Sequence, residues 1–193
     1  MDDLRNEVNA AYSAAAQNPR GAHPFPVGRT FAESIGYTPE ALGGIPDDCI
    51  DAFTGVSNIS MTVDIPAGAV VLDLGCGSGL DSLIAARRAG PNGRVIGIDF
   101  SDAMLARACA GLTKSGIGNV ELRKAEAEHL PLADSSISIA LVNGIFNLNP
   151  AREQIFRELA RVVRPDGAVY AAELLLSAPL PSEVLSSPTN WFA

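Results

Sequence analysis

Short β-branched apolar runs alternate with amphipathic stretches of helical period from Ala69 onward, and this alternation restricts the fold more than any other feature. The expected elements are strands at 69–74, 94–99, 119–125, 136–143 and 168–175, and helices at 80–89, 101–114 and 150–163. Parallel strands need crossover connections, so the pattern predicts a parallel sheet covered by helices. Right-handed crossovers bring the loops to the carboxyl edge of such a sheet, where ligands bind. We therefore expect a doubly wound α/β fold with a ligand site at that edge.

The N-terminal region differs from the rest, because prolines interrupt it and allow only short regular elements. An amphipathic helix is expected from Leu4 to Gln17, ending before Pro19, since the residue before a proline avoids the α region. The next stretch, GAHPFPVGRT, is expected to be irregular. Short helices are expected to begin at Thr38-Pro39 and at Pro46-Asp47, because proline suits the first turn of a helix.

A chain of 193 residues has the size of one ordinary domain. We expect residues 1–65 to form a helical cap of the same domain, 66–176 the core, and 177–193 a C-terminal segment. The 47% of hydrophobic residues are too many for a disordered chain, and a net charge of −8 supplies no basic stripe for nucleic acid. No apolar run approaches the ~18–20 residues of a membrane span, and the acidic start does not resemble a secretory signal. The sequence favours a cytoplasmic protein without nucleic-acid or membrane partners.

The cysteines are sparse and odd in number, which argues against a disulfide framework: Cys49, Cys76 and Cys109. No CxxC or His/Cys spacing typical of a metal site occurs, and the only histidines are His23 and His129. The sequence therefore predicts no metal centre.

A glycine-rich loop, Asp73-Leu74-Gly75-Cys76-Gly77-Ser78-Gly79, connects the first expected strand to its helix. Glycines allow a sharp turn and a close approach of a ligand to the main chain. Asp99 closes the second strand about 20 residues later, where a carboxylate can accept both hydroxyls of a ribose. The spacing is GxGxG and not the GxGxxG of nicotinamide sites, and Asp73 would repel a pyrophosphate but suit a cationic or amino-bearing ligand.

Four motifs in order, VLDLGCGSG, GIDFSDAML, NVELRKAEAEHLPL and ELARVVRPDG, resemble those of class I S-adenosylmethionine-dependent methyltransferases. The resemblance runs from about Val70 to Glu173. It implies a Rossmann-like sheet, S-adenosyl-L-methionine as cofactor, S-adenosyl-L-homocysteine as product and a small-molecule acceptor.

The resemblance also assigns the cofactor to particular positions: Asp73, Gly75, Cys76, Gly77, Gly79, Asp99, Phe100, Met104, Ala125, Glu126, Ala127 and Asn143. It implies that the glycine loop lies against the methionine part, with Asp73 toward the ammonium group. Asp99 would hold the ribose, Phe100 would pack on the adenine, and Glu126 would lie near the adenine amino group. Asn143 would face the sulfonium and the methyl group.

Longer stretches, such as GPNGRVIGIDFSDAMLARA and the Asn147-Leu148-Asn149-Pro150 run after strand four, resemble the arsenite methyltransferase branch. Arsenite is a soft centre that is best held by cysteine sulfurs. Where that branch has cysteines, this chain has Val56 before the first strand and Gly144 after strand four, and it lacks an N-terminal cysteine cluster. Arsenite methylation is therefore disfavoured.

The sequence identifies no catalytic residue. His129 lies near the expected cofactor face, but a histidine in a segment such as Glu128-His129-Leu130-Pro131 more often packs or forms hydrogen bonds locally. Asp81 is best interpreted as an acidic residue in the first turn of a helix. In the cap, the side chains that could line an acceptor site are Tyr12, His23, Arg29 and Tyr37. Three alternatives stay open: a cofactor-binding protein without transfer activity, an arsenite methyltransferase-like enzyme with an altered acceptor, and a nicotinamide oxidoreductase.

The chain is short for the family it resembles, which usually completes the sheet with two further strands. Pro179, Pro181 and Pro188 leave little room for another strand after residue 175. We expect the last two strands to be missing, as in a truncated or short form or one half of an assembly. An unpaired fifth strand is an exposed edge. The C-terminal segment or a second copy in a homodimer is expected to cover it.

Overall fold

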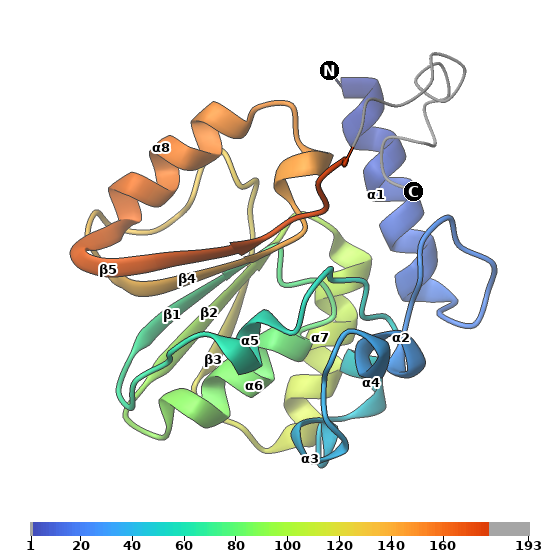
Figure 1. The fold of residues 1–193 in the computed structure, drawn as a ribbon, viewed down its shortest axis with the longest axis horizontal. Coiled ribbons are helices and arrows are strands. Elements are labelled where there is room, and N and C mark those ends of the chain that lie inside the picture. Colours follow the sequence, from blue (N-terminus) through green and yellow to red (C-terminus); the bar gives the residue numbers. More distant parts are fainter. Residues whose placement is uncertain (1, 178–193) are drawn as a thin grey trace.

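The computed structural model describes residues 2–177, and they form a five-stranded parallel sheet of order β3-β2-β1-β4-β5. The strands are β1 Val70–Leu74, β2 Arg94–Asp99, β3 Val120–Lys124, β4 Ile137–Asn143 and β5 Val163–Ala172. The order changes direction beside β1, and the carboxyl ends of β1 and β4 lie together there. The expected Rossmann-like sheet is thus confirmed (Figure 1).

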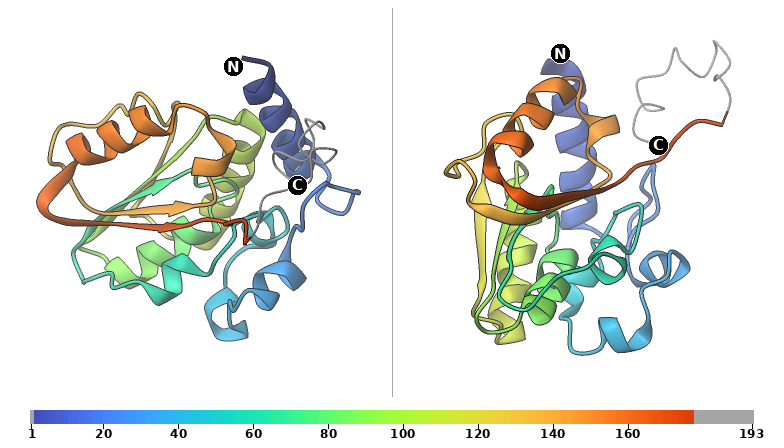
Figure 2. Two further views of the ribbon diagram at one scale, coloured as in Figure 1. Left: turned by 45° about the horizontal axis from the view of Figure 1, so that its top comes forward. Right: turned by 60° about the vertical axis from the view of Figure 1, so that its left-hand side comes forward.

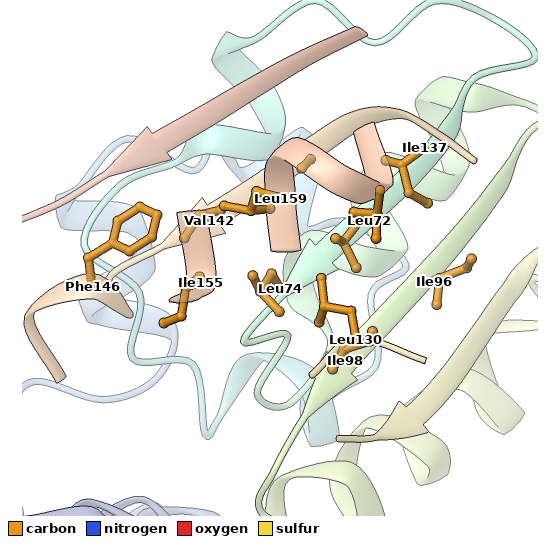
Figure 3. Close-up of a cluster of buried hydrophobic side chains, with 12 residues drawn as sticks. Leu72, Leu74, Ile96, Ile98, Leu130, Ile137, Val142, Phe146, Ile155 and Leu159 are labelled. Carbon is orange, nitrogen blue, oxygen red and sulfur yellow. The ribbon is translucent and has the colours of Figure 1, made fainter. Parts of the chain in front are cut away.

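Helices cover both faces of the sheet: α6 Leu80–Ala89 and α7 Asp102–Ser115 lie on one side, and α8 Arg152–Val162 lies on the other (Figure 1). The side chains of β1 alternate accordingly. Leu72 and Leu74 belong to the cluster beneath α8, whereas Val71 packs with α6. Figure 3 shows the first cluster between α8 and the sheet. Both faces of the central strands are therefore buried, as expected of a parallel sheet.

A loop, residues 125–136, and not a helix connects β3 to β4. Leu130 of this loop is buried in the cluster beneath α8. Arg161 of α8 donates to the carbonyl oxygens of Leu130 and Leu132 at 3.0 and 2.7 Å, and Glu158 accepts from the Leu130 N–H at 2.6 Å. These bonds attach the loop to α8 and fix the position of its start beside the ends of β2 and β3.

The N-terminal region forms five helices: α1 Asp2–Gln17, α2 Arg29–Ser34, α3 Pro39–Leu42, α4 Asp47–Ile50 and α5 Ile59–Thr62. The expected first helix is confirmed, and the expected starts at residues 39 and 47 are confirmed for α3 and α4. The prediction of an irregular GAHPFPVGRT is wrong at its end, because α2 begins at Arg29. The helix α5 was not predicted.

The cap packs onto the core through a shared apolar cluster. Tyr37, Leu42 and Phe53 are buried there together with Leu80 and Leu83 of α6. The helix α1 runs alongside α7 (Figure 2). The Arg107 guanidinium of α7 donates to the Ala16 carbonyl oxygen at the end of α1.

The predicted bounds of the last strand, 168–175, are wrong at both ends. Val163 already pairs with Ile137, but Ala168 pairs with Ile139, so four residues of β5 form an irregularity opposite one residue of β4. The expected turn at Pro165-Asp166-Gly167 lies within this irregularity. Regular pairing resumes at Ala168 and ends at Ala172.

Expectations for the C-terminal segment fall almost wholly on residues 178–193, including the three late prolines, and lie outside the described residues. Within 2–177, β5 is the last strand of the sheet. In the same range, no helix is both long and apolar enough to cross a membrane.

Candidate functional site

A cavity lies at the carboxyl ends of β1, β2 and β4 and spans about 1080 Å³ with its open mouth. Its floor is formed by the loops after β1, β2 and β3, and one wall by the loop after β4. Arg5, Val8 and Tyr12 of α1 and the segment 52–55 close the remaining sides. Its position at the carboxyl ends of the strands, beside the point where the strand order reverses, is typical of ligand sites in open α/β sheets.

The glycine loop turns sharply at the end of β1 because three of its residues have positive φ: Gly75 at 76°, Gly77 at 51° and Gly79 at 86°. The amides of Gly75 and Cys76 donate to the Ile98 carbonyl oxygen at 2.8 and 3.0 Å, which fixes the loop to β2. A Cβ atom at residue 75 would collide with the Ile145 side chain. The loop therefore brings main chain close to the cavity.

Asp99 ends β2 and is 8% exposed. Its carboxylate accepts the N–H of Gly77 and the N–H of Ser101, each at 2.8 Å. Burial raises its pKa, and the amides of Ser101, Gly77 and Phe100 oppose the rise. A carboxylate has about four acceptor sites, so these amides do not use all of them.

Asp73, at 2% exposure, is one of the most buried carboxyl groups of the cavity wall. It accepts the hydroxyl of Ser82 at 2.6 Å. Burial and, next, the neighbouring Asp81 raise the pKa of Asp73. A cation in the cavity would favour the charged forms of both aspartates.

Asp81 of α6 is also a wall residue, and it is buried. Its carboxylate accepts the Tyr37 hydroxyl at 2.5 Å, the Ser60 hydroxyl, and the Asn143 amide at 2.8 Å. Burial raises its pKa, and the Ser60, Tyr37 and Asn143 hydrogen bonds oppose the rise. The interpretation of Asp81 as only a first-turn acid is incomplete, because its side chain joins the cap to β4.

Asn143 uses all the hydrogen-bonding positions of its amide group. The oxygen accepts the N–H groups of Val56 and Ser57 at 2.9 and 3.1 Å. The nitrogen donates to the Ser57 carbonyl oxygen and to Asp81, both at 2.8 Å. The side chain borders the cavity and holds the segment that follows residue 55.

The remaining floor is largely apolar and comes from Phe100, Ala125, Ala127, Ile98 and Leu74. Glu126 lies at its rim, with its carboxylate 3.9 Å from the Arg5 guanidinium. Arg5 also contacts the buried Glu128. The α1 helix is thus attached to the loop after β3.

The cavity brings together most of the residues that the sequence assigned to a cofactor, and two lie behind its wall. Met104 is 1% exposed and packs beneath Gly77, with Ala15 and Ala16 of α1 in the same cluster. Gly79 is the N-cap residue that precedes α6, and it faces Ala108. Both shape the loop without bordering the cavity.

The thiols are separated. Cys49 lies against Gly111, and its pKa is raised to about 12, chiefly by burial. Cys76 borders the cavity, where burial and then Asp99 and Asp73 raise the thiol pKa well above its usual value. Cys109 is exposed. Among the described residues, no group of three His, Cys, Asp or Glu side chains could hold a metal ion.

Val56 and Gly144, the two positions at which the sequence resemblance implied cysteines in the arsenite branch, lie side by side in the structure. A Cβ atom at Gly144 would lie 3.1 Å from Cγ1 of Val56. This pair of positions therefore carries one aliphatic side chain and no thiol.

Some of the lining residues were not identified from the sequence: Arg5, Val8, Thr54, Gly55, Ser78, Ile145, Leu148, Asn149 and Pro150. Of the cap candidates, Tyr12 borders the cavity and Tyr37 reaches it through Asp81. His23, Arg29 and His129 do not border it. The Asn147-to-Pro150 run was the one signal that pointed to this wall.

Comparison with known proteins gives one consistent result. The sequence matches a family model described as a methyltransferase domain over residues 65–192. It is 35% identical over 159 residues to the arsenite methyltransferase of Halobacterium salinarum, which covers 82% of this chain and 40% of that protein. It is 36% identical to the demethylmenaquinone methyltransferase of Lactobacillus johnsonii over 56% of this chain and 45% of that protein.

Among solved structures, the fold is similar to that of an arsenic(III) S-adenosylmethionine methyltransferase from Chlamydomonas reinhardtii, with a TM-score of 0.69 and 31% identity. That match covers 77% of this chain and 52% of the other. The chain spans about half the length of these relatives or less.

Proposed function

Since this chain belongs to the class I S-adenosylmethionine-dependent methyltransferases, close to the arsenite methyltransferase branch, we propose that it transfers the methyl group of S-adenosylmethionine to a small-molecule acceptor. The observation that carries this proposal is the arrangement of Asp99 and the glycine loop in one cavity, where a buried carboxylate with free acceptor positions lies beside exposed main chain.

The residues fit the cosubstrate in both shape and charge. The Asp99 carboxylate keeps acceptor capacity for a ribose hydroxyl beside its backbone amide donors. Phe100 and Ala127 offer an apolar surface to the adenine, and Glu126 lies at the rim for its amino group. The buried Asp73 suits a ligand that carries an ammonium and a sulfonium. A nicotinamide dinucleotide would bring its pyrophosphate to the same aspartate and be repelled.

The chain's contribution to methyl transfer is alignment and exclusion of water. The sulfonium supplies the electrophilic methyl carbon, and the protein orients an acceptor in line with the carbon–sulfur bond. Arg5, Val8 and Tyr12 of α1 and the segment 52–55 line the cavity and reduce the contact of the two reactants with water. Val56 and Gly144 offer no sulfur for arsenite, so the acceptor differs from that of the relatives or binds by other means.

Calorimetry with S-adenosylhomocysteine tests the proposal directly. We expect binding to the protein, and Asp99→Ala should weaken it by ~1–3 kcal/mol through lost hydrogen bonds to a charged group. Asp166→Ala, at an exposed position, is the control and should leave affinity unchanged. A protein that binds neither S-adenosylmethionine nor S-adenosylhomocysteine would refute the proposal. Binding without turnover on any acceptor would instead support the alternative of a non-transferring protein.

The cytoplasmic location and the homodimer also remain predictions.

A further inference from the structure

The polar side chains in the deep wall of the cavity are already hydrogen-bonded to the protein. Asp73 accepts from Ser82 at 2.6 Å. Asp81 accepts from Tyr37, Ser60 and Asn143, and the Asn143 amide is fully used. The Asn143 amide therefore has no position left for an acceptor, and these donors hold the carboxyl groups of Asp73 and Asp81 in place.

The wall formed by the segment 52–55 and the loop after β4 presents mainly carbon. It consists of Phe53 and Gly55 from the cap and Ile145, Leu148 and Pro150 from the loop after β4. No histidine or lysine is among the described residues that border the cavity, and Arg5, its one cation, is paired with Glu128 and Glu126. Among the described residues, an acceptor bound there therefore meets an apolar surface without a histidine or a lysine to take a proton.

The charges around the cavity decide which acceptors this surface can take. The buried carboxyl groups of Asp73, Asp81 and Asp99 all border it. The same surroundings raise the pKa of the Cys76 thiol, by burial first and by Asp99 and Asp73 next. A phenol or thiol acceptor in this cavity would experience the same opposition to ionisation. An anionic nucleophile is thus disfavoured, and a cation is favoured.

We propose that the acceptor is a neutral, largely apolar lone-pair base, a tertiary or aromatic amine or a thioether, and that the product is an onium cation. This inference rests on the proposed methyl transfer. The acceptor's lone pair forms the new bond to the methyl carbon, the carbon–sulfur bond breaks, and its electron pair stays on sulfur. The positive charge moves from the sulfonium to the acceptor. No proton is released, so no base is required.

Transfer assays with three small aromatic probes test the proposal. We expect 4-phenylpyridine to give its N-methylpyridinium and methyl phenyl sulfide to give its dimethylsulfonium, each with an equivalent of S-adenosylhomocysteine. The matched probe 4-phenylphenol should give at least about tenfold less methylated product, the factor that corresponds to ~1.4 kcal/mol in the barrier. Faster methylation of the phenol, or no methylation of either neutral base by a protein that binds S-adenosylhomocysteine, would overturn it.

A binding measurement provides a second readout that does not depend on turnover. With S-adenosylhomocysteine present, N-methyl-4-phenylpyridinium should bind more tightly than 4-phenylphenol. Asp81→Asn should lower the affinity for the cation about tenfold or more, because the negative charge is lost. The variant also disturbs the bonds from Tyr37, Ser60 and Asn143, and the smaller change expected for the phenol measures that structural part. Asp73→Asn should act in the same direction, which guards against misfolding of the first variant. Asp47→Asn, at an exposed position, is the control.

The outcomes separate the two proposals. Failure to bind S-adenosylhomocysteine would refute the methyl-transfer function itself. Binding of S-adenosylhomocysteine with equal affinity for the cation and the phenol, or with no effect of either aspartate variant, would refute only the onium-forming acceptor.

Discussion

Nδ2 of Asn143 donates a 2.8 Å hydrogen bond to Oδ2 of Asp81, and this contact joins the end of β4 to the first turn of α6. The remaining positions of the Asn143 amide hold Val56 and Ser57. Asn143 therefore acts as a positioning residue that fixes the segment after the cap wall of the cavity. Its amide has no position left for a ligand while these bonds persist.

Asn143→Ala should leave the N–H groups of Val56 and Ser57 without a partner and remove one of the three donors to the carboxylate of Asp81. We expect a loss of ~1–3 kcal/mol in the free energy of unfolding, since buried polar groups without partners are costly. Hydrogen exchange should become faster at the amides of residues 56 and 57 in particular. Asn92→Ala, in the exposed turn before β2, is the control. Unchanged exchange at 56 and 57 would contradict the positioning role.

Asp73 makes stability depend on pH in a definite direction. Its pKa lies above the ordinary 3.8 in the folded protein because of burial and Asp81, so the folded state binds more protons than the unfolded state. Its contribution to the free energy of unfolding is full below pH 3.8 and is lost as pH rises through the raised pKa. Carboxyl groups whose pKa is lowered in the folded protein change its stability with pH in the opposite direction. The test therefore compares the pH dependence of variants with that of the unchanged protein.

Asp73→Asn should flatten that fall in stability with rising pH, as measured by urea unfolding at a series of pH values. The exposed Asp47→Asn should keep the slope of the unchanged protein. S-adenosylmethionine should bind more tightly as pH rises over the same window, because its cation favours the ionised carboxylate. Equal slopes in the Asp73 variant and the unchanged protein would show that Asp73 does not titrate in this way.

Gly75→Ala combines two penalties, a residue with φ of 76° and a Cβ that collides with Ile145. We expect a loss of ~1–3 kcal/mol in stability from the backbone conformation alone, and weaker binding of S-adenosylhomocysteine. Adding Ile145→Ala should restore part of the binding by removing the collision. Gly118→Ala, where a Cβ would meet no atom within 4 Å, is the matched control. Full tolerance of alanine at residue 75 would contradict the close approach described here.

Arg161→Gln tests the attachment of the loop 125–136 to α8. The variant loses donors to the Leu130 and Leu132 carbonyl oxygens, and we expect a loss of ~1–3 kcal/mol in thermal or urea unfolding. Arg157→Gln on the same helix loses only the exposed pair with Glu153, worth ~0.3–0.5 kcal/mol. Equal effects of the two substitutions would show that the loop does not depend on Arg161.

The sheet was predictable because its strands are buried on both faces and its helix ends carry local signals. Ser101 caps α7, and Gly116 ends it with a φ of 69°. The last strand was misplaced because Val163 pairs across a register irregularity that no local pattern marks. The helix α2 was missed because it follows a proline-rich stretch and depends on packing of Ala32 in the cap cluster.

The floor of the site follows from motifs, since the glycine loop and Asp99 are adjacent to strand ends. The wall formed by the segment 52–55 and the loop after β4 does not follow from motifs, because only the tertiary fold brings Phe53 and Leu148 to the same cavity. Met104 shows that a motif can also mislead. It lies in the GIDFSDAML motif next to positions assigned to the cofactor, but α7 directs its side chain behind the glycine loop. Hydrophobic periodicity predicts which face of a helix is buried, whereas the element that this face packs against depends on the tertiary structure.

Ser101 makes contacts in three directions: its hydroxyl caps α7, its N–H binds Asp99, and the same hydroxyl lies 3.1 Å from that of Ser13 in α1. A single small residue thus connects the buried carboxylate of Asp99 with helix α1. Natural variation at this position would disturb the start of α7, the hydrogen bonding of Asp99 and the docking of α1 at once. We expect it to tolerate far fewer substitutions across related chains than Ser13, whose replacement affects the docking of α1 alone.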